Sequence, residues 1–350
     1  MKLLLDLSMS EMEAVLEGYK EPSFRALQLY QWLQKGAHFD EMKNIPKTLI
    51  EKLKKDGYID QPIEIVQCLT SKIDGTKKYI YKLYDGNVIE GVLMKYKYGN
   101  TICVSTQVGC RMNCAFCASG LDGLVRNLSA GEILGQVVAV NRDNIVDNED
   151  RSITNIVLMG SGEPLDNYDN VTKFLDLVND EKGLNISKRN ISLSTCGLCD
   201  KIYKLADDGY AVTLTISLHA PDNETRINIM PVTKKFKVED IMKAVKYYFD
   251  KTGRRIVFEY SMIEGTNDSK EHALKLAKLL KGLPSHVNII ALNYVKERGL
   301  HSANKDSISK FMKVLENNNV SCTLRRTMGA DIDGACGQLR RKYMEGNDAK

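Results

Sequence analysis

The 350-residue sequence has no long apolar run, and none reaches the roughly 18 residues that a membrane-spanning helix needs. Its first residues, "MKLLLDLSMSEMEAV", also lack the long apolar core and the small-residue cleavage site of a signal peptide. From these two features we expect neither a membrane protein nor a secreted one. We therefore expect a cytoplasmic protein with no membrane association, whose thiols stay reduced.

Internal repeats and low-complexity tracts are also missing. The composition, 43% hydrophobic and 27% charged, is that of a globular protein. The length suits one large domain with a smaller accessory domain. The net charge of only +4 is compatible with an anionic partner but does not by itself identify a nucleic-acid-binding protein.

The first sixty residues are rich in lysine and have helical patterns. In "SFRALQLYQWLQKG", Phe24, Leu27, Tyr30 and Leu33 recur every three residues, close to helical spacing. A further helix, "PKTLIEKLKKDG", begins at a proline and ends at a glycine. Residues 61–98 alternate instead like strands, and the Asp85-Gly86 pair predicts a hairpin between two of them.

From residue 101 onward, short apolar strands alternate with helical stretches. Ser129 and Glu132 form a capping-box pattern at the start of the first such helix. This alternation predicts an α/β fold with a parallel sheet, open or partly closed into a barrel. Polar and glycine-rich loops follow the strands, and in such folds these loops converge on the face that carries the chemistry. The six predicted strands are 101–106, 154–159, 190–195, 212–217, 255–262 and 287–292.

Three of the nine cysteines, Cys110, Cys114 and Cys117, form a C-x3-C-x2-C pattern on one loop. An odd number of cysteines in a reducing compartment indicates metal ligands or catalytic thiols rather than disulfides. A structural zinc site needs a fourth ligand, which would be Cys103 or a distant group, since no histidine is nearby. An iron–sulfur cluster with three thiolates leaves one iron open for a cofactor. Three unconnected buried cysteines are the remaining alternative.

The loop after the next strand, "GSGEPLD", could also be a dinucleotide-binding loop, but the third glycine of G-x-G-x-x-G is missing. Instead, the cysteine pattern with Phe116 before its last member, together with "GSGEP", resembles the radical S-adenosylmethionine (SAM) superfamily. This resemblance implies a partial (βα)6 barrel, a 4Fe-4S cluster on the three cysteines, and SAM bound at the open iron. Reductive cleavage of SAM in that superfamily releases a 5′-deoxyadenosyl radical.

Further segments resemble the RlmN family more closely: "CVSTQVGCRMNCAFC", "MGSGEPLDNYDNV", "ISLHAPDNETR" and "RRTMGADIDGACGQL". Members of this family are dual-specificity methyltransferases that act on carbon 2 of adenine. Their substrates are 23S rRNA, at the peptidyl transferase centre, and tRNA, at the adenine next to the anticodon. The resemblance extends over nearly the whole chain, and its most specific block is "DIDGACGQL", residues 331–339.

The resemblance implies a ping-pong reaction that uses two SAM molecules per turnover. One methylates Cys336, and the radical from the second takes a hydrogen atom from that S-methyl group. The resulting methylene adds to the electron-poor carbon of adenine, and the thiol of Cys103 resolves the covalent adduct by disulfide exchange. Glu90 matches the position of the family's general base. The alternative is that Glu90 is simply a solvent-exposed carboxylate on a strand, without a catalytic role. Gly334, Ala335 and Gly337 flank Cys336 and leave room for its sulfur.

Residues that match the family's SAM-binding positions all fall at or just after the ends of predicted strands. The C-x-x-C pair of Cys196 and Cys199 resembles a redox or zinc half-site, and we interpret it as incidental. Ser161 stands where methionine is common in the family. Because the backbone is expected to make the contact there, we expect this difference to have little effect on SAM binding. The matched positions are Gly162, Glu163, Ser194, Ser217, Leu218, His219 and Asn293.

Basic residues that could hold RNA phosphates gather in two places, although a solvated surface is the usual explanation of a short charge run. The resemblance also implies a small redox protein, of flavodoxin or ferredoxin type, as electron donor, and we expect a monomer. The two clusters are Lys43, Lys47, Lys52, Lys54 and Lys55 near the N-terminus, and Arg325, Arg326, Arg340, Arg341 and Lys342 around Cys336.

Four segments are expected to divide these tasks. Residues 1–60 would be a small, mainly helical accessory domain that binds RNA, and 61–100 a strand-rich connecting extension. Residues 101–325 would form the partial radical SAM barrel, and 326–350 the catalytic loop and tail. Two alternatives remain: a Cfr-type enzyme, which methylates carbon 8 of the same rRNA adenine and confers antibiotic resistance, and a metal-stabilised RNA-binding protein without catalysis.

Overall fold

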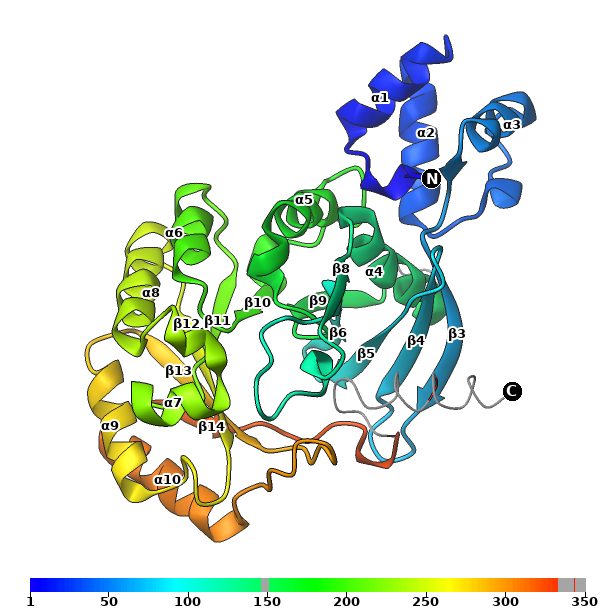
Figure 1. Ribbon diagram of the computed structural model, residues 1–350. Coiled ribbons are helices and arrows are strands. Elements are labelled where there is room, and N and C mark those ends of the chain that lie inside the picture. Colours follow the sequence, from blue (N-terminus) through cyan, green and yellow to red (C-terminus); the bar gives the residue numbers. More distant parts are fainter. Residues whose placement is uncertain (146–150, 333–342, 344–350) are drawn as a thin grey trace.

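The computed structural model describes residues 1–145, 151–332 and 343. The N-terminal region is helical, as its patterns predict, and forms a small unit at one end of the molecule (Figure 1). A short parallel pair of strands joins its beginning to its end. The elements are β1 (Lys2–Leu3), α1 (Met9–Gly18), α2 (Ser23–Gln34), α3 (Lys47–Lys55) and β2 (Tyr58–Ile59).

The buried face of α2 differs from the one that its three-residue spacing indicates. Tyr30 and Leu33 are buried, but Leu27 is only partly buried and Phe24 is 55% exposed. Strict three-residue steps drift around a helix that has 3.6 residues per turn, so the first members of the series leave the core face. Ala26 and Leu29 occupy that face in their place.

A ten-stranded mixed sheet forms the centre of the molecule, in the order β14-β13-β12-β11-β10-β9-β6-β5-β4-β3. Within this sheet, β6 and β9 to β14 run parallel, and β3, β4 and β5 continue the sheet as antiparallel neighbours. The hairpin predicted at Asp85-Gly86 joins β4 to β5, and Gly86 has φ +84° there. The strands are β3 (Ile63–Thr70), β4 (Lys77–Leu83), β5 (Val88–Tyr96), β6 (Gly99–Cys103), β9 (Ile153–Leu158), β10 (Ile191–Thr195), β11 (Thr213–Ser217), β12 (Ile256–Met262), β13 (Ser285–Ala291) and β14 (Cys322–Leu324).

The six predicted strands correspond to β6, β9, β10, β11, β12 and β13, with ends that differ by a few residues. The seventh parallel strand, β14, was not predicted, since three residues are too few for a periodic pattern. Most of the helices that connect the strands lie along the outside of the curved sheet (Figure 1). They are α4 (Ala130–Asn144), α5 (Tyr168–Asn179), α6 (Cys199–Asp207), α8 (Val238–Thr252), α9 (Lys270–Leu280) and α10 (Lys305–Asn317). The short helix α7 (Asn223–Ile229) lies instead at the ends of β10 and β11, where its Arg226 binds carbonyl oxygens.

The capping box predicted at the start of α4 is present. The Ser129 side chain accepts from the Glu132 backbone N–H, and the Glu132 carboxylate accepts from the Ser129 N–H. The architecture confirms the α/β prediction with its helical N-terminal unit. In the part of the chain that the structure describes, no helix combines the length and apolar composition needed to cross a membrane.

Candidate active site

A short antiparallel ribbon presents the three-cysteine loop. Its strands are β7 (Gln107–Gly109) and β8 (Leu124–Asn127), and the cysteines lie between them. Gly109 has φ +78°, and a Cβ atom at this position would lie against the carbonyl oxygen of Gly123. The Cys110 N–H donates to that same oxygen at 2.8 Å. Glycine at position 109 therefore lets the loop close at its base.

The loop is held on its other side by loops that follow neighbouring elements of the sheet. Arg298 donates from Nε to the Cys117 carbonyl at 3.2 Å and from Nη2 to Asn113 Oδ1 at 3.0 Å. The Ala115 N–H donates to the Ile229 carbonyl at 2.8 Å. These contacts fix the loop backbone against the loop that follows β13 and against the end of α7.

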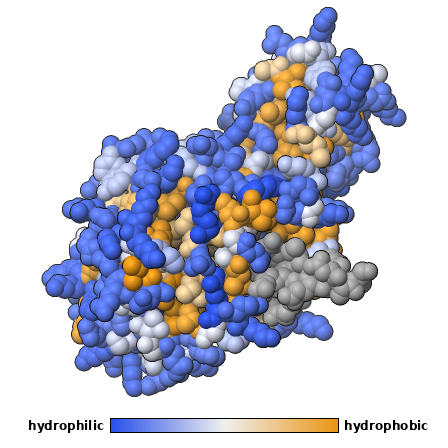
Figure 2. Space-filling view, viewed as in Figure 1, coloured by the Kyte–Doolittle hydropathy of each residue, from blue (hydrophilic) through white to orange (hydrophobic). Residues whose placement is uncertain are grey.

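A cavity of about 260 Å³ opens where the parallel strands end, and all three cysteines line it. The face drawn in Figure 2 has apolar residues gathered in its middle, with hydrophilic residues around them. Leu218, also expected to contact SAM, is fully buried beside this cavity. The other predicted SAM-binding residues all line it: Gly162, Glu163, Ser194, Ser217, His219 and Asn293.

Burial keeps the thiols of Cys110 and Cys114 protonated when no cation is near. It raises the pKa of Cys110 to about 12, and burial, followed by the neighbouring thiol of Cys117, raises the pKa of Cys114 further. A bound metal compensates the thiolate charge and releases these protons. Among the described residues, no three His, Cys, Asp or Glu side chains are already arranged around a metal position. Three thiols from one loop, facing a cavity, nevertheless suit a cluster that leaves one iron for another ligand.

His219 is buried and adopts the left-handed conformation, with φ +56°. Its Nδ1 accepts from the Ser261 N–H at 3.0 Å, and its ring meets Phe116 edge-on at 4.7 Å between centroids. Burial, together with the charge of Arg226, lowers the pKa of His219 to about 3. The ring is therefore neutral, and because Nδ1 is an acceptor, Nε2 carries the proton.

Glu163 is buried beside Gly162, and burial raises the pKa of its carboxyl group. The carboxylate accepts from the Cys196 N–H at 2.8 Å and the Leu165 N–H at 3.1 Å. The side chain thus ties the ends of two neighbouring strands together. Gly162 has φ +111°, and a Cβ atom there would lie 2.7 Å from the Gln107 Cβ.

Replacing Gly162 with alanine is expected to destabilise the protein by about 1–3 kcal/mol, since it forces both a strained φ and a backbone shift. The same shift should weaken SAM binding, because this backbone lines the cavity. Thermal unfolding and equilibrium dialysis of the reconstituted protein measure the two effects. Gly18→Ala is the control, since nothing lies within 4 Å of its Cβ position; equal behaviour of the two variants would contradict this expectation.

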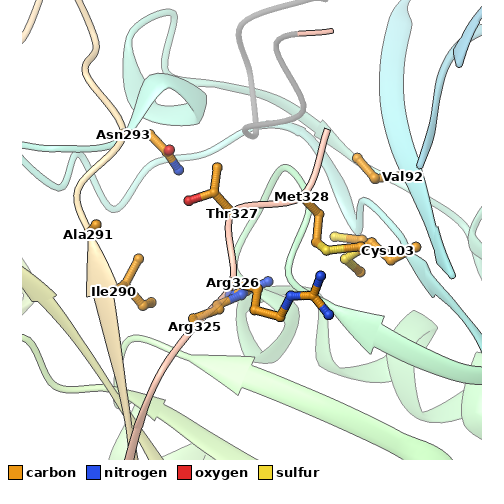
Figure 3. A pocket seen from close by; sticks show the side chains of 10 residues that line it. Val92, Cys103, Ile290, Ala291, Asn293, Arg325, Arg326, Thr327 and Met328 are labelled. Atoms are coloured by element: carbon orange, nitrogen blue, oxygen red, sulfur yellow. The ribbon is translucent and has the colours of Figure 1, made fainter. Parts of the chain in front are cut away.

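A second cavity, of about 130 Å³, holds Cys103. Figure 3 shows Val92 and Met328 around Cys103, with Ile290, Ala291 and Asn293 on the opposite side. Ile290, Asn293 and Arg325 line both cavities, so the two adjoin. Cys103 itself lines the second cavity and is separate from the three thiols of the first.

Cys336 lies outside the described residues, as do Arg340, Arg341 and Lys342. The chain that leads to it is anchored on the turn between β3 and β4. Asp331 accepts from Ser71 Oγ at 2.6 Å and from the Lys72 N–H at 2.9 Å, while the Gly329 N–H donates to Asp74 at 2.9 Å. The segment that precedes Cys336 is thus held beside the sheet that carries Cys103.

No sequence motif indicated several of the buried polar groups at the site. Arg226 is completely buried and binds carbonyl oxygens at the ends of β10 and β11. Glu259 lines the first cavity, and its carboxylate pairs with Arg325 at 3.2 Å. The only signal that could have found Glu259 is a charged residue inside the apolar strand "RIVFEYSM".

The remaining predicted residues fall in different surroundings. Glu90 is 3% exposed, whereas an unremarkable strand carboxylate would be solvated. Cys196 lines the first cavity, and Cys199 lies buried with its thiol 3.5 Å from the Gly197 carbonyl. The N-terminal lysines are all exposed on and beside α3: Lys43, Lys47, Lys52, Lys54 and Lys55.

Comparisons with known proteins agree with this site. A family model described as the radical SAM superfamily matches residues 104–277. Another, described as the ribosomal RNA large subunit methyltransferase N-terminal domain, matches residues 3–59. The fold and the three-cysteine loop therefore define a radical SAM enzyme, which implies a 4Fe-4S cluster and SAM as cofactors.

Similar proteins and a solved structure show which family of radical SAM enzymes the chain resembles. The chain is 51% identical over 344 residues to "Probable dual-specificity RNA methyltransferase RlmN" of Thermoanaerobacter sp. (strain X514), covering 98% of both chains. It is 50% identical to the protein of that name from Clostridium novyi (strain NT), over 99% of this chain and 100% of the relative. The crystal structure of a radical SAM methyltransferase from Sphaerobacter thermophilus superposes with a TM-score of 0.92 at 38% identity, covering 97% of this chain and 99% of that one. The chain belongs to the RlmN family of radical SAM RNA methyltransferases.

Proposed function

We propose that the protein methylates carbon 2 of adenine in 23S rRNA, at the peptidyl transferase centre, and in tRNA, at the adenine next to the anticodon. The observation that carries this proposal is the pair of adjoining cavities. One is lined by the three loop thiols and the expected SAM contacts, and the other by Cys103. A methyl carrier with a resolving thiol needs both sites within reach of one base.

The loop thiols of Cys110, Cys114 and Cys117 would hold the cluster, and its open iron would hold SAM. When bound, these cofactors supply a methyl group and, from a second SAM, a radical able to take a hydrogen atom from an S-methyl group. The Gly162 backbone, Glu163 and neutral His219 would orient SAM in the larger cavity. The remaining contacts would come from Ser194, Ser217, Leu218 and Asn293.

Three residues would act on the RNA base itself. The sulfur of Cys336 would carry the methyl carbon and bond it to adenine, which is too electron-poor to attack a sulfonium directly. Glu90 would accept the proton that carbon 2 of adenine loses once the adduct has formed. The thiol of Cys103 would then attack the Cys336 sulfur and leave a disulfide and the methylated base.

RNA would reach this site with its target adenine exposed or flipped out of its stack. Exposed lysines on and beside α3, and Arg325 and Arg326 at the smaller cavity, are available for phosphate contacts. We assign RNA binding to residues 1–60, sheet extension to 61–100, cofactor chemistry to 101–325 and methyl transport to 326–350. We further propose a cytoplasmic monomer that receives electrons from a flavodoxin- or ferredoxin-type protein.

Anaerobic incubation of reconstituted protein with RNA, reductant and methyl-labelled SAM tests the proposed function. We expect label in both a 23S rRNA fragment and tRNA, at carbon 2 of adenine by mass mapping. The Cys114→Ala variant should bind less iron and transfer no label, because one thiolate of the cluster is missing. Unlabelled RNA at full cluster occupancy would overturn the proposal, and a methyl group at carbon 8 would favour the Cfr-type activity.

A further inference from the structure

A lysine and a glutamate form an ion pair inside the antiparallel part of the sheet. The Nζ atom of Lys78 on β4 lies 3.4 Å from Oε1 of Glu90 on β5, and the two side chains are 0% and 4% exposed. Lysine and glutamate are almost never buried to this extent unless they are paired. Burying even a paired lysine and glutamate costs hydration free energy, and the attraction between the two charges often does no more than offset that cost. Stability alone therefore gives no reason for this pair.

The strand register brings the pair close to Cys103. Lys78 is directly opposite Val92, and Val92 is directly opposite Cys103 on the next strand, so the three form one row across the sheet. Glu90 lies two residues before Val92 and therefore points to the same face. The carboxylate thus belongs to the row that adjoins the Cys103 row. The hydroxyl of Ser105, two residues after Cys103, donates to the Glu90 carbonyl at 2.8 Å.

Apolar side chains share this face of the sheet with the pair. Ile80 and Val88 form one buried cluster, and Val92 and Met94 form another with Cys103. Met328 packs against the second cluster from the segment that leads to Cys336. A carboxylate among such neighbours is strongly disfavoured unless a cation compensates it.

We propose that Lys78 is the positioning residue for Glu90. This inference rests on the proposed function, in which Glu90 is the general base. The ammonium group holds one carboxylate oxygen in place and keeps the carboxylate inside the apolar layer beside Cys103. In the step concerned, the C–H bond at carbon 2 of the adenine adduct breaks. Glu90 receives the proton and the ring keeps the electron pair of that bond, while the one surplus electron of the radical adduct would pass to a one-electron oxidant, the cluster left oxidised by the cleavage of SAM.

The Lys78→Met variant tests this role in the full-length reconstituted enzyme. We expect kcat to fall by about tenfold or more, since a positioned base contributes on the order of 10²–10⁴-fold. KM values for RNA and SAM should change little, because Lys78 is not among the residues that line either cavity. Mass spectrometry measures the methylation of Cys336 in a reaction that contains no RNA. This methylation should stay at the wild-type level, because it precedes the step that needs the base. Lys78→Arg should recover part of the lost kcat.

Lys82→Met is the matched control. Lys82 lies four residues further along β4 on the same face, but it is exposed, so the variant should keep wild-type kcat. Circular dichroism and thermal unfolding verify that each variant is folded. If Lys78→Met does not fold, Lys78→Gln, which keeps a hydrogen-bond donor without the charge, replaces it in every measurement.

A double-mutant cycle with Glu90→Gln decides whether Lys78 acts through Glu90. Adding Lys78→Met to Glu90→Gln should lower kcat by less than about twofold beyond Glu90→Gln alone, since residues that act as one unit are not additive. Independent, multiplicative losses would overturn the proposal, and so would a Lys78→Met enzyme with wild-type kcat.

The same experiment separates this inference from the proposed function. If the wild-type enzyme labels RNA and Glu90→Gln impairs labelling, the proposed function stands. The double-mutant cycle then tests only the positioning role of Lys78. If Glu90→Gln is as active as wild type, the base assignment fails and the role of Lys78 with it. If the wild-type enzyme transfers no methyl group to RNA, the proposed function itself is overturned.

Discussion

Replacing Cys103 with alanine is expected to leave RNA covalently attached to the enzyme. Cys103 lies at the cavity that adjoins the SAM-binding cavity, and in the proposed reaction its thiol releases the base from Cys336. Without that thiol, addition to adenine should still occur, while the carbon–sulfur bond of the adduct should persist. Multiple turnover should fall to a background level, and the adduct should approach one RNA per enzyme.

Denaturing gels with labelled RNA measure this adduct, and mass spectrometry after nuclease digestion should locate it on Cys336. The control is Cys199→Ala, which removes another buried thiol and should turn over normally. A Cys103→Ala/Cys336→Ala enzyme should form no adduct, because the carrier is gone. Ordinary turnover by Cys103→Ala would remove the resolving role from this residue.

The Arg226→Met variant is expected to be the most destabilised of the substitutions considered. Arg226 is 0% exposed, and its guanidinium donates to four acceptors. Methionine fills most of the volume but leaves these buried oxygens without a donor, at about 1–3 kcal/mol for each that finds no other partner. The acceptors are Leu218 O at 2.9 Å, Ser217 O at 3.2 Å, Cys196 O at 2.6 Å and Thr233 Oγ1 at 2.9 Å.

We expect a loss of about 3–5 kcal/mol in the free energy of unfolding, since backbone carbonyls can find partial substitutes. Tm should fall by on the order of 10 °C. SAM binding should weaken as well, because the carbonyls belong to strand ends that line the larger cavity. Urea unfolding and equilibrium dialysis measure the two effects.

Arg189→Met, at an exposed arginine, is the control for loss of charge and should stay within about 0.5 kcal/mol of wild type. Arg226→Lys should be intermediate, because a single ammonium group cannot reach all four acceptors in the fork geometry of arginine. An Arg226→Met enzyme that unfolds like wild type would show that these oxygens find other partners.

Local patterns determined much of this molecule. The alternation of strands and helices predicted the six main parallel strands, and Ser129 with Glu132 predicted the start of α4. Asp85-Gly86 located the hairpin between β4 and β5. Such signals depend on residues within a few positions of one another, where backbone geometry and hydrogen bonding are already decided.

The resemblance to the RlmN family named the candidate SAM-binding residues, and a rule that links sequence to space agrees with it. The carboxyl ends of parallel strands meet at one edge of the sheet, and Gly162, Ser194 and Asn293 all fall at or after the ends of predicted strands. These residues, more than 30 positions apart, do line one cavity together with the three thiols. Their roles in binding SAM stay predictions.

Only the tertiary structure decided which polar groups are buried together. In the sequence, nothing distinguishes Arg226 from an ordinary helix residue, and Lys78 is one of several lysines in "KKYIYKLYDG". The register of β4, β5 and β6 aligns Lys78 with Cys103 and sets Glu90 beside them. The two hairpin turns fix that register. No local pattern showed that this face of the three strands is buried, because burial depends on packing between residues far apart in the sequence. The sequence by itself therefore determined the elements and the thiol loop, while the folded sheet decided which charges lie beside the reacting sulfur.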